Sequence, residues 1–172
     1  TSDRQMDQNR QSNGHHGLTN GGDDNVFSNF DFQSLFIHDI TVSRSSGNVQ
    51  KNGRGVDLAL DHHRHAPYEN LFTNIHTGAG TRVWRSGGGS DLGAHCAARG
   101  TFWNITADEP IEPPDAKFGP WSMNFVGVFM NIDDATSPNQ RWIEYAKGET
   151  VKPLDLHAAQ LQRRLASSTQ RR

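Results

Sequence analysis

Cysteine is nearly absent from this sequence, and its scarcity excludes two classes of protein. Cys96 is the only cysteine among 172 residues, so the chain can form neither a disulfide framework nor a cysteine-based zinc motif. No apolar run approaches the ~18 residues that a membrane-spanning helix needs, and no signal peptide is recognisable. Hydrophobic residues make up only 33% of the sequence, below the roughly 45–50% of an ordinary globular domain.

An excess of charge of either sign is also missing. The formal net charge is −2, so no strongly basic surface indicates a nucleic-acid partner. Glycine is abundant, with 17 residues, and Asn, Asp and Ser are frequent. This mixture is typical of many short strands joined by turns, and the length fits one domain or part of one.

One short phrase, an aromatic residue followed by x-Asn-Ile, returns along the chain. It is clearest at positions 72–75, 102–105 and 129–132, and Asp39-Ile40 resembles its ending. The steps in residue number between the Ile positions are 35 (40 to 75), 30 (75 to 105) and 27 (105 to 132). A period of roughly 20–50 residues indicates a solenoid. In such a coil the apolar ends of the phrase face inward, and the Asn occupies a turn and bonds to its neighbour in the stack.

The sequence thus predicts an all-β fold, a right-handed parallel β-helix of about four coils. We expect a polar arm at residues 1–25, coils at 26–150, a capping helix at 151–166 and a short tail at 167–172. The helix is expected to lie over an open coil end, because terminal coils expose apolar surface and unpaired strand edges. Its apolar face consists of Leu154, Ala158, Leu161 and Leu165.

The number of coils suggests that part of the β-helix is missing from this chain. Few coils are visible, and nothing at the start resembles a cap. We therefore expect the chain to be the C-terminal part of a longer β-helix. Its coils would then pack against further coils on a removed segment or on another chain.

The densest group of chemically active side chains lies at residues 57–65. Val56, Leu58 and Leu60 alternate as the buried face of a strand, which predicts an outward ridge of polar side chains that Arg64 accompanies. An acid, a base and a cation within a few residues suit proton transfer near neutral pH. The alternative is a solvated, charged strand end. The ridge consists of Asp57, Asp61, His63 and His65, with Ala59 between them.

A second group flanks the glycine-rich loop at residues 86–90. Arginine offers a planar fork for carboxylate groups, tryptophan offers a flat face for a sugar ring, and glycine allows close approach to the backbone. The loop lacks the Lys-Ser/Thr ending of a phosphate-binding loop. If the coils stack in register, both groups would line one basic groove. The predicted substrate-binding residues are Arg82, Trp84, Arg85 and His95, together with Asp57.

No cofactor is predicted. The acidic pairs Asp23-Asp24 and Asp133-Asp134 make Ca²⁺ the one ion worth considering, although neither pair matches the twelve-residue calcium loop. We interpret the pair His15-His16 as solvated rather than as a metal site.

Three stretches of this sequence resemble secreted pectate-lyase-like β-helix proteins of bacteria and fungi. They are residues 60–75 (LDHHRHAPYENLFTNI), residues 101–105 (TFWNI) after the Ser86-Gly87-Gly88 loop, and residues 156–161 (LHAAQL). The likeness covers roughly residues 26–165 and is to a C-terminal module of polysaccharide-degrading proteins. It implies a secreted or periplasmic carbohydrate-active protein. The superfamily includes lyases, glycoside hydrolases and phage tailspikes, so the fold alone does not choose among them.

Three functions follow from these residues. A polysaccharide lyase needs a cation, here Arg64, Arg82 or Arg85, and a base, here His63 or His65. A glycoside hydrolase needs two carboxylates about 6.5–9.5 Å apart for inversion, but Asp57 and Asp61 would lie about 13 Å apart on one strand. Glycan binding or simple closure of a longer solenoid is the third. Because His and Arg dominate, the sequence favours a lyase acting on an acidic polysaccharide.

Overall fold

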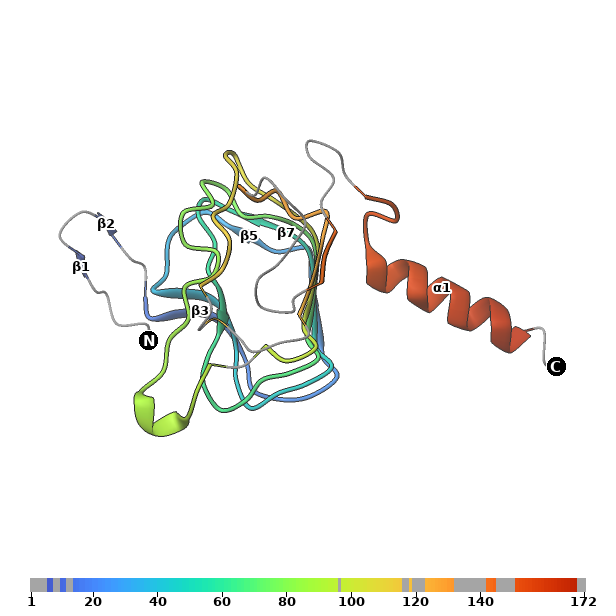
Figure 1. The fold of residues 1–172 in the computed structure, drawn as a ribbon, viewed down its shortest axis with the longest axis horizontal. Coiled ribbons are helices and arrows are strands. Elements are labelled where there is room, and N and C mark those ends of the chain that lie inside the picture. The colour runs from blue at the N-terminus through green and yellow to red at the C-terminus, as the bar shows by residue number, and fades with distance from the viewer. Residues whose placement is uncertain are drawn as a thin grey trace.

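The protein is a parallel β-solenoid. The computed structural model describes residues 6–7, 10–11, 14–95, 97–115, 118, 123–131, 142–144 and 151–169. These residues form a solenoid of about five turns with one C-terminal helix. Figure 1 shows successive coils following nearly the same outline. The expected parallel β-helix is therefore confirmed, with about one coil more than the sequence revealed.

Two parallel sheets form the walls of the solenoid. The smaller one contains β3 (His16–Asn20), β6 (His38–Val42) and β8 (Leu60–His62). The larger one has the order β12-β11-β10-β9-β7-β4, and β5 also pairs with β7. Its strands are β4 (Val26–Ser28), β5 (Asp31–Phe32), β7 (Val49–Gly55), β9 (Leu71–His76), β10 (Thr101–Thr106), β11 (Asn124–Val126) and β12 (Trp142–Glu144). Outside the walls lie the antiparallel pair β1 (Met6–Asp7) and β2 (Arg10–Gln11) and the short 3-10 helix η1 (Ser90–Leu92).

Five successive coils of the larger sheet turn at a residue with left-handed backbone geometry. The turning residue comes directly after the aligned positions Ser28, Lys51, Thr73, Trp103 and Val126. These turning residues are Asn29, Asn52, Asn74, Asn104 and Gly127, with φ of 59°, 53°, 55°, 52° and 62°. Asparagine tolerates this region because its side chain bonds to nearby groups. Here Asn74 Nδ2 donates to Asn52 Oδ1 at 2.8 Å, which confirms the expected turn and stacked Asn pair.

The steps between these turning residues give the true coil length. In residue number they are 23 (29 to 52), 22 (52 to 74), 30 (74 to 104) and 23 (104 to 127). Only two of the four predicted phrases obey this register, since Ile75 is aligned with Ile105. Ile40 lies in the smaller sheet opposite Leu60, and Ile132 lies outside the described residues. The prediction was wrong at Ile40 because both sheets use similar apolar–polar–apolar patterns.

A second asparagine ladder precedes the strands of the larger sheet. Asn48 donates to Asn70 Oδ1 from its backbone N at 3.1 Å and from Nδ2 at 3.0 Å. The backbone N of Asn25 donates to Asn48 Oδ1 at 2.9 Å. Asn48 and Asn70 are buried, so each amide satisfies backbone groups that would otherwise be costly to bury. The two ladders fix the register at both ends of the strands.

Aromatic stacking fills the interior. Phe72, Phe102 and Phe125 occupy one register, with centroid separations of 5.2 and 5.1 Å and interplanar angles of 9° and 7°. His62 is completely buried against them, 5.2 Å from the Phe72 ring. Burial lowers the pKa of His62 to about 4, so its imidazole is neutral and packs as a core side chain.

The solenoid begins earlier than the sequence indicated. The predicted arm at residues 1–25 contains β3, which pairs with β6 from His16 opposite His38 to Asn20 opposite Val42. Residues from 14 onward thus belong to the first coil. The sequence obscured this strand because only Leu18 carries a large apolar side chain.

The expected C-terminal helix is present, but its contacts are on the side of the solenoid. In Figure 1, α1 (Leu156–Thr169) lies outside the ring of coils. The segment before it crosses the outer face of the larger sheet, where Trp103 Nε1 donates to Pro153 O at 2.6 Å and Lys51 Nζ pairs with Asp155 Oδ2 at 2.8 Å. The apolar face expected to cover a coil end is largely exposed, at 46% for Leu161 and 57% for Leu165.

The asparagine turns can be tested at Asn74. Asn74→Ala is expected to lower the free energy of unfolding by about 1–2 kcal/mol, because it strains the left-handed position and removes the bond to Asn52. Asn74→Gly should cost less, since glycine adopts this geometry readily. Denaturant unfolding compares the two variants, and equal losses would contradict the role given to backbone geometry.

Asp155 provides a pH-dependent test of helix docking. Although burial opposes it, bonds from Lys51, Ala158 N and Asn52 hold the pKa of Asp155 below its usual value. Because the pKa of Asp155 is lower in the folded state, its ionised carboxylate stabilises the docked helix at pH values above the pKa of the unfolded state. This stabilisation is lost as the pH falls through the pKa of the folded state. We expect Asp155→Asn to loosen residues 154–158 at pH 7 by no more than about 1 kcal/mol.

Hydrogen exchange of residues 154–158, measured at pH 7 and at pH 3, checks this expectation. The wild-type protein should lose protection on acidification, whereas Asp155→Asn should start with low protection and change little. Equal pH sensitivity in both proteins would assign the effect to another carboxyl group.

Candidate functional site

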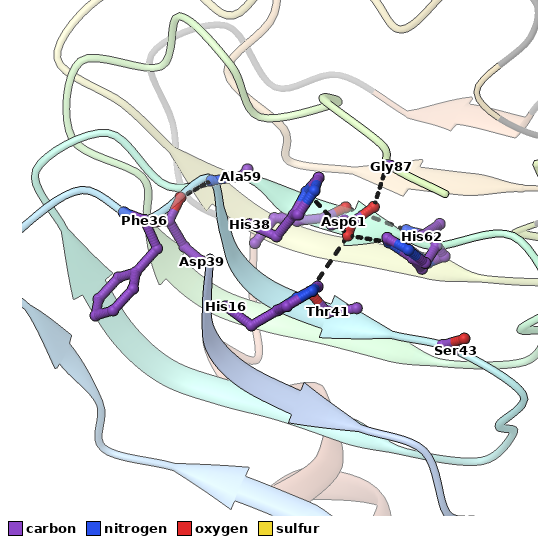
Figure 2. Close-up of polar contacts among 12 residues, drawn as sticks. His16, Phe36, His38, Asp39, Thr41, Ser43, Ala59, Asp61, His62 and Gly87 are labelled. Atoms are coloured by element: carbon purple, nitrogen blue, oxygen red, sulfur yellow. Dashed lines mark hydrogen bonds and ion pairs between the residues drawn. The ribbon is translucent and has the colours of Figure 1, made fainter. Parts of the chain in front are cut away.

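Asp61 is the centre of a buried polar cluster on the smaller sheet. It lies in β8 opposite Thr41 of β6, and its side chain is fully buried. Its Oδ2 accepts from Thr41 Oγ1 at 3.2 Å and from His63 Nδ1 at 2.7 Å. Its Oδ1 accepts from Gly87 N at 2.7 Å. Figure 2 shows these bonds converging on the carboxylate.

Imidazole rings surround the carboxylate. His38 Nδ1 lies 3.2 Å from Asp61 Oδ2, and His16 Nδ1 lies 3.0 Å from Thr41 Oγ1. The ring of His38 is 5.0 Å from that of His16 and 5.3 Å from that of His63. Figure 2 shows His16 and His38 on neighbouring strands, both directed toward Asp61. One carboxylate and three imidazoles thus lie together on the smaller sheet.

Burial keeps the His38 imidazole uncharged at neutral pH. It lowers the pKa of His38 to about 4, even though the Asp61 carboxylate opposes the change. Burial also lowers the pKa of His16, with help from His15 and His63. Neutral imidazoles can accept protons or bind metal ions. The electrostatics of the cluster therefore suit either role.

The glycine-rich loop covers the cluster. Gly87 reaches across β8, and a Cβ atom there would come within 2.4 Å of His38 Cε1 and 2.8 Å of His63 Cε1. Gly88, with φ of 105°, lies against the Arg64 side chain, whose Nη1 donates to Gly93 O. We expected these glycines to let a ligand approach the backbone. The groups that approach it are the protein's own imidazoles.

The loop exists because one coil is longer than the others. The step in residue number from Asn74 to Asn104 is 30, whereas the other steps are 22 or 23. After Val83, whose O accepts from Leu60 N at 2.8 Å, the chain crosses the outer face of the smaller sheet. The additional residues of this coil therefore cover the Asp61 cluster.

The predicted outward ridge at residues 57–65 is wrong in its geometry. The strand covers only Leu60–His62, Val56 is 47% exposed, and Asp57 and Asp61 are buried. The alternation failed because the chain turns before Leu58. His63 is partly exposed, but the glycine-rich loop at residues 86–90 covers Asp61 and separates it from solvent.

Arg82 and Asp57 belong to a structural ion-pair network. Arg82 Nη2 donates to Asp39 Oδ2 and, at 2.7 Å, to Phe36 O, and its Nε donates to Asp57 O at 2.8 Å. Asp57 Oδ2 accepts from Thr81 Oγ1 at 2.6 Å. Burial raises the pKa of Asp39, an effect that Arg82 opposes. Residues 81–84 form a turn, and this network holds it in place.

The remaining predicted site residues have separate contacts. Arg44 Nη2 lies 3.1 Å from His65 Nε2, and His95 Nδ1 lies 3.4 Å from His62 O. Trp84 Nε1 donates to Glu112 O at 2.8 Å, and the Arg85 side chain is exposed. Arg82, Trp84 and Arg85 line one pocket of about 670 Å³ together with residues 109–113.

Sequence reasoning missed His16 and His38. The signal that could have found His16 is coil-length spacing, since the step in residue number from His16 to His38 is 22 and places the two residues opposite each other on neighbouring coils. Asp61 lies opposite Thr41, so the contact of His38 with Asp61 comes from their side chains and not from the register.

Comparisons of the chain with protein-family models, with curated proteins and with solved structures find no match. Among the described residues, no helix is both long enough and apolar enough to cross a membrane.

Gly87→Ala tests how the loop is docked. The added methyl group should push the loop away from His38 and His63 and weaken the bond from Gly87 N to Asp61. Loss of one such bond, about 1 kcal/mol, corresponds to a roughly fivefold faster exchange of the Gly87 amide. Gly21→Ala is the control, since its nearest atom would be an ordinary 3.7 Å away. Unchanged exchange in Gly87→Ala would refute the close packing.

Proposed function

We propose that this chain is part of a secreted enzyme of the pectate-lyase-like superfamily that cleaves an acidic polysaccharide by β-elimination. The observation that supports it most is the 2.7 Å contact between His63 Nδ1 and the buried Asp61 carboxylate. The parallel solenoid and the resemblance of residues 60–75 and 101–105 agree with this assignment.

His63 is the proposed catalytic base. A carboxylate can only accept, so His63 Nδ1 carries the proton in this contact and Nε2 keeps its lone pair. Asp61 is a positioning residue that fixes this tautomer, as a carboxylate does for a catalytic imidazole. The His63 side chain is 18% exposed, which leaves it a route to substrate. His65 is the weaker choice, because an Arg44 nitrogen already occupies its Nε2.

The elimination step assigns each group a task. His63 Nε2 removes the proton from C5 of a uronate, the C4=C5 double bond forms, the C4–O4 bond breaks, and the leaving oxygen takes a proton from water. The reaction is easier when a cation neutralises the uronate carboxylate. Arg85 is the proposed cation, because it is exposed at the edge of the pocket and lies two residues before Gly87. Arg82 is engaged by Asp39.

The hydrolase alternative loses its expected carboxylate pair. Asp57 and Asp61 are both buried and already accept hydrogen bonds, so neither is placed to flank a scissile bond. Glu109 and Glu112 line the pocket beside Arg85, and they would be the carboxylates of a hydrolase.

The test is a panel of uronic-acid polysaccharides, with product followed by the ultraviolet absorbance of the unsaturated sugar. His63→Ala should lower the rate by about 10²–10⁴-fold. His76→Ala is the matched control, because His76 is an exposed imidazole on the larger sheet. Thermal unfolding confirms that each variant is folded.

The other outcomes are equally informative. New reducing ends without absorbance would indicate a hydrolase, and the absence of both signals would indicate glycan binding or a structural role. A fully active His63→Ala variant would exclude His63 as the base.

A further inference from the structure

We infer that His38, Asp61 and His63 form a binding site for a divalent transition-metal ion of the zinc class, and that the bound ion inactivates His63 as a base. The second half of this inference rests on the proposed function. Metal binding itself does not, because it follows from the arrangement of the three side chains alone.

The three donor atoms already converge. One donor atom from each residue lies within 4.8 Å of the other two, and His38 Nδ1 and His63 Nδ1 are 3.2 and 2.7 Å from Asp61 Oδ2. In a tetrahedral zinc site with bonds of about 2.1 Å, neighbouring donors lie about 3.4 Å apart. The His38 distance nearly fits, and the His63 distance needs an opening of about 0.7 Å.

An unsatisfied buried group points into this space. The His38 side chain is 9% exposed, and its Nδ1 is buried without a hydrogen-bond partner among the described residues. That nitrogen faces the Asp61 carboxylate at 3.2 Å without the geometry of a hydrogen bond. Buried polar groups are normally paired. A cation between the two atoms would satisfy both.

The charge around Asp61 is also incomplete. Its contacts within the described part of the chain are a hydroxyl, a backbone N–H and two imidazoles. No Lys or Arg forms an ion pair with Asp61 there, since Arg82 pairs with Asp39 and Arg64 bonds to Gly93 O. Buried carboxylates are usually paired or bound to a metal.

The donor set selects the class of ion. Two imidazole nitrogens and one carboxylate oxygen suit Zn²⁺, Co²⁺ or Ni²⁺, whereas Ca²⁺ prefers six to eight oxygens. The Gly87 loop closes one side of the site. His16, whose ring is 5.0 Å from that of His38 and 5.7 Å from that of His63, flanks the more exposed side. It is placed to supply a fourth ligand or to border a bound water.

Metal binding would change the tautomer of His63. An ion on Nδ1 displaces the proton that this nitrogen donates to Asp61, and the neutral ring then carries its proton on Nε2. The atom proposed to accept the C5 proton would become a donor. Bound zinc would therefore inhibit elimination without occupying the pocket that Arg82, Trp84 and Arg85 line.

Titration of the metal-stripped full chain with Zn²⁺ tests the site, using calorimetry and competition with a chromophoric chelator. We expect one ion per chain and a loss of affinity of about two orders of magnitude in His38→Ala and in Asp61→Asn. His76→Ala should bind as the wild-type protein does. Co²⁺ should give the visible absorption of a tetrahedral N/O site, and Ca²⁺ should not compete.

Each alternative result has a definite meaning. Wild-type affinity in His38→Ala would overturn the site, as would binding that is lost only when the exposed pair His15-His16 is replaced by alanine. If Asp61→Asn does not fold, His38→Ala and the Co²⁺ spectrum decide. If zinc binds as expected but the protein cleaves no polysaccharide, the metal site stands and the proposed function fails.

Discussion

Left-handed backbone geometry is required at the same corner of five successive coils, and this requirement sets the register of the solenoid. Asn29, Asn52, Asn74, Asn104 and Gly127 meet it. Because the corner recurs at a nearly constant spacing in the regular coils, the strands stack in register. Side chains at equivalent positions of successive coils then lie over one another. The phenylalanine stack follows from this inside the wall. On the smaller sheet the same register places His16 opposite His38 and Thr41 opposite Asp61.

The longer coil, from Asn74 to Asn104, adds a loop over the stacked side chains of the site. Its additional residues cover Asp61, and Gly87 satisfies one carboxylate oxygen. A carboxylate that loses water needs compensation from its neighbours. Here the compensation comes from neutral donors and imidazoles. This environment orients His63 in the proposed elimination, and it also favours a cation in the proposed metal site. Both roles use the same Nδ1 atom, so they exclude each other.

Much of the fold could be predicted from the sequence, and less of the site. The Asn-Ile phrase at 74–75 and 104–105 was enough to indicate a solenoid with Asn turns, because turn chemistry is local. The sequence did not reveal the true register, because Gly53 occupies the position of Ile in the phrase and Gly127 occupies the position of Asn. The alternation in residues 57–65 predicted that Asp61 and His63, two residues apart on one strand, lie on the same face. His16 and His38 could be added only once the coil length was known. The ion pairs of Arg82 could not be predicted, because nothing in the sequence shows that Asp39 and Asp57 surround it.

The proposed elimination depends on Asp61 holding His63 with a proton on Nδ1 and a lone pair on Nε2. The ¹⁵N NMR spectrum of the imidazole side chains in the metal-free protein at neutral pH reports this tautomer directly. We expect His63 in the Nδ1–H tautomer and expect Asp61→Asn to abolish this preference. A His63 ring that carries its proton on Nε2, or that is fully protonated at this pH, would rule out His63 as the base.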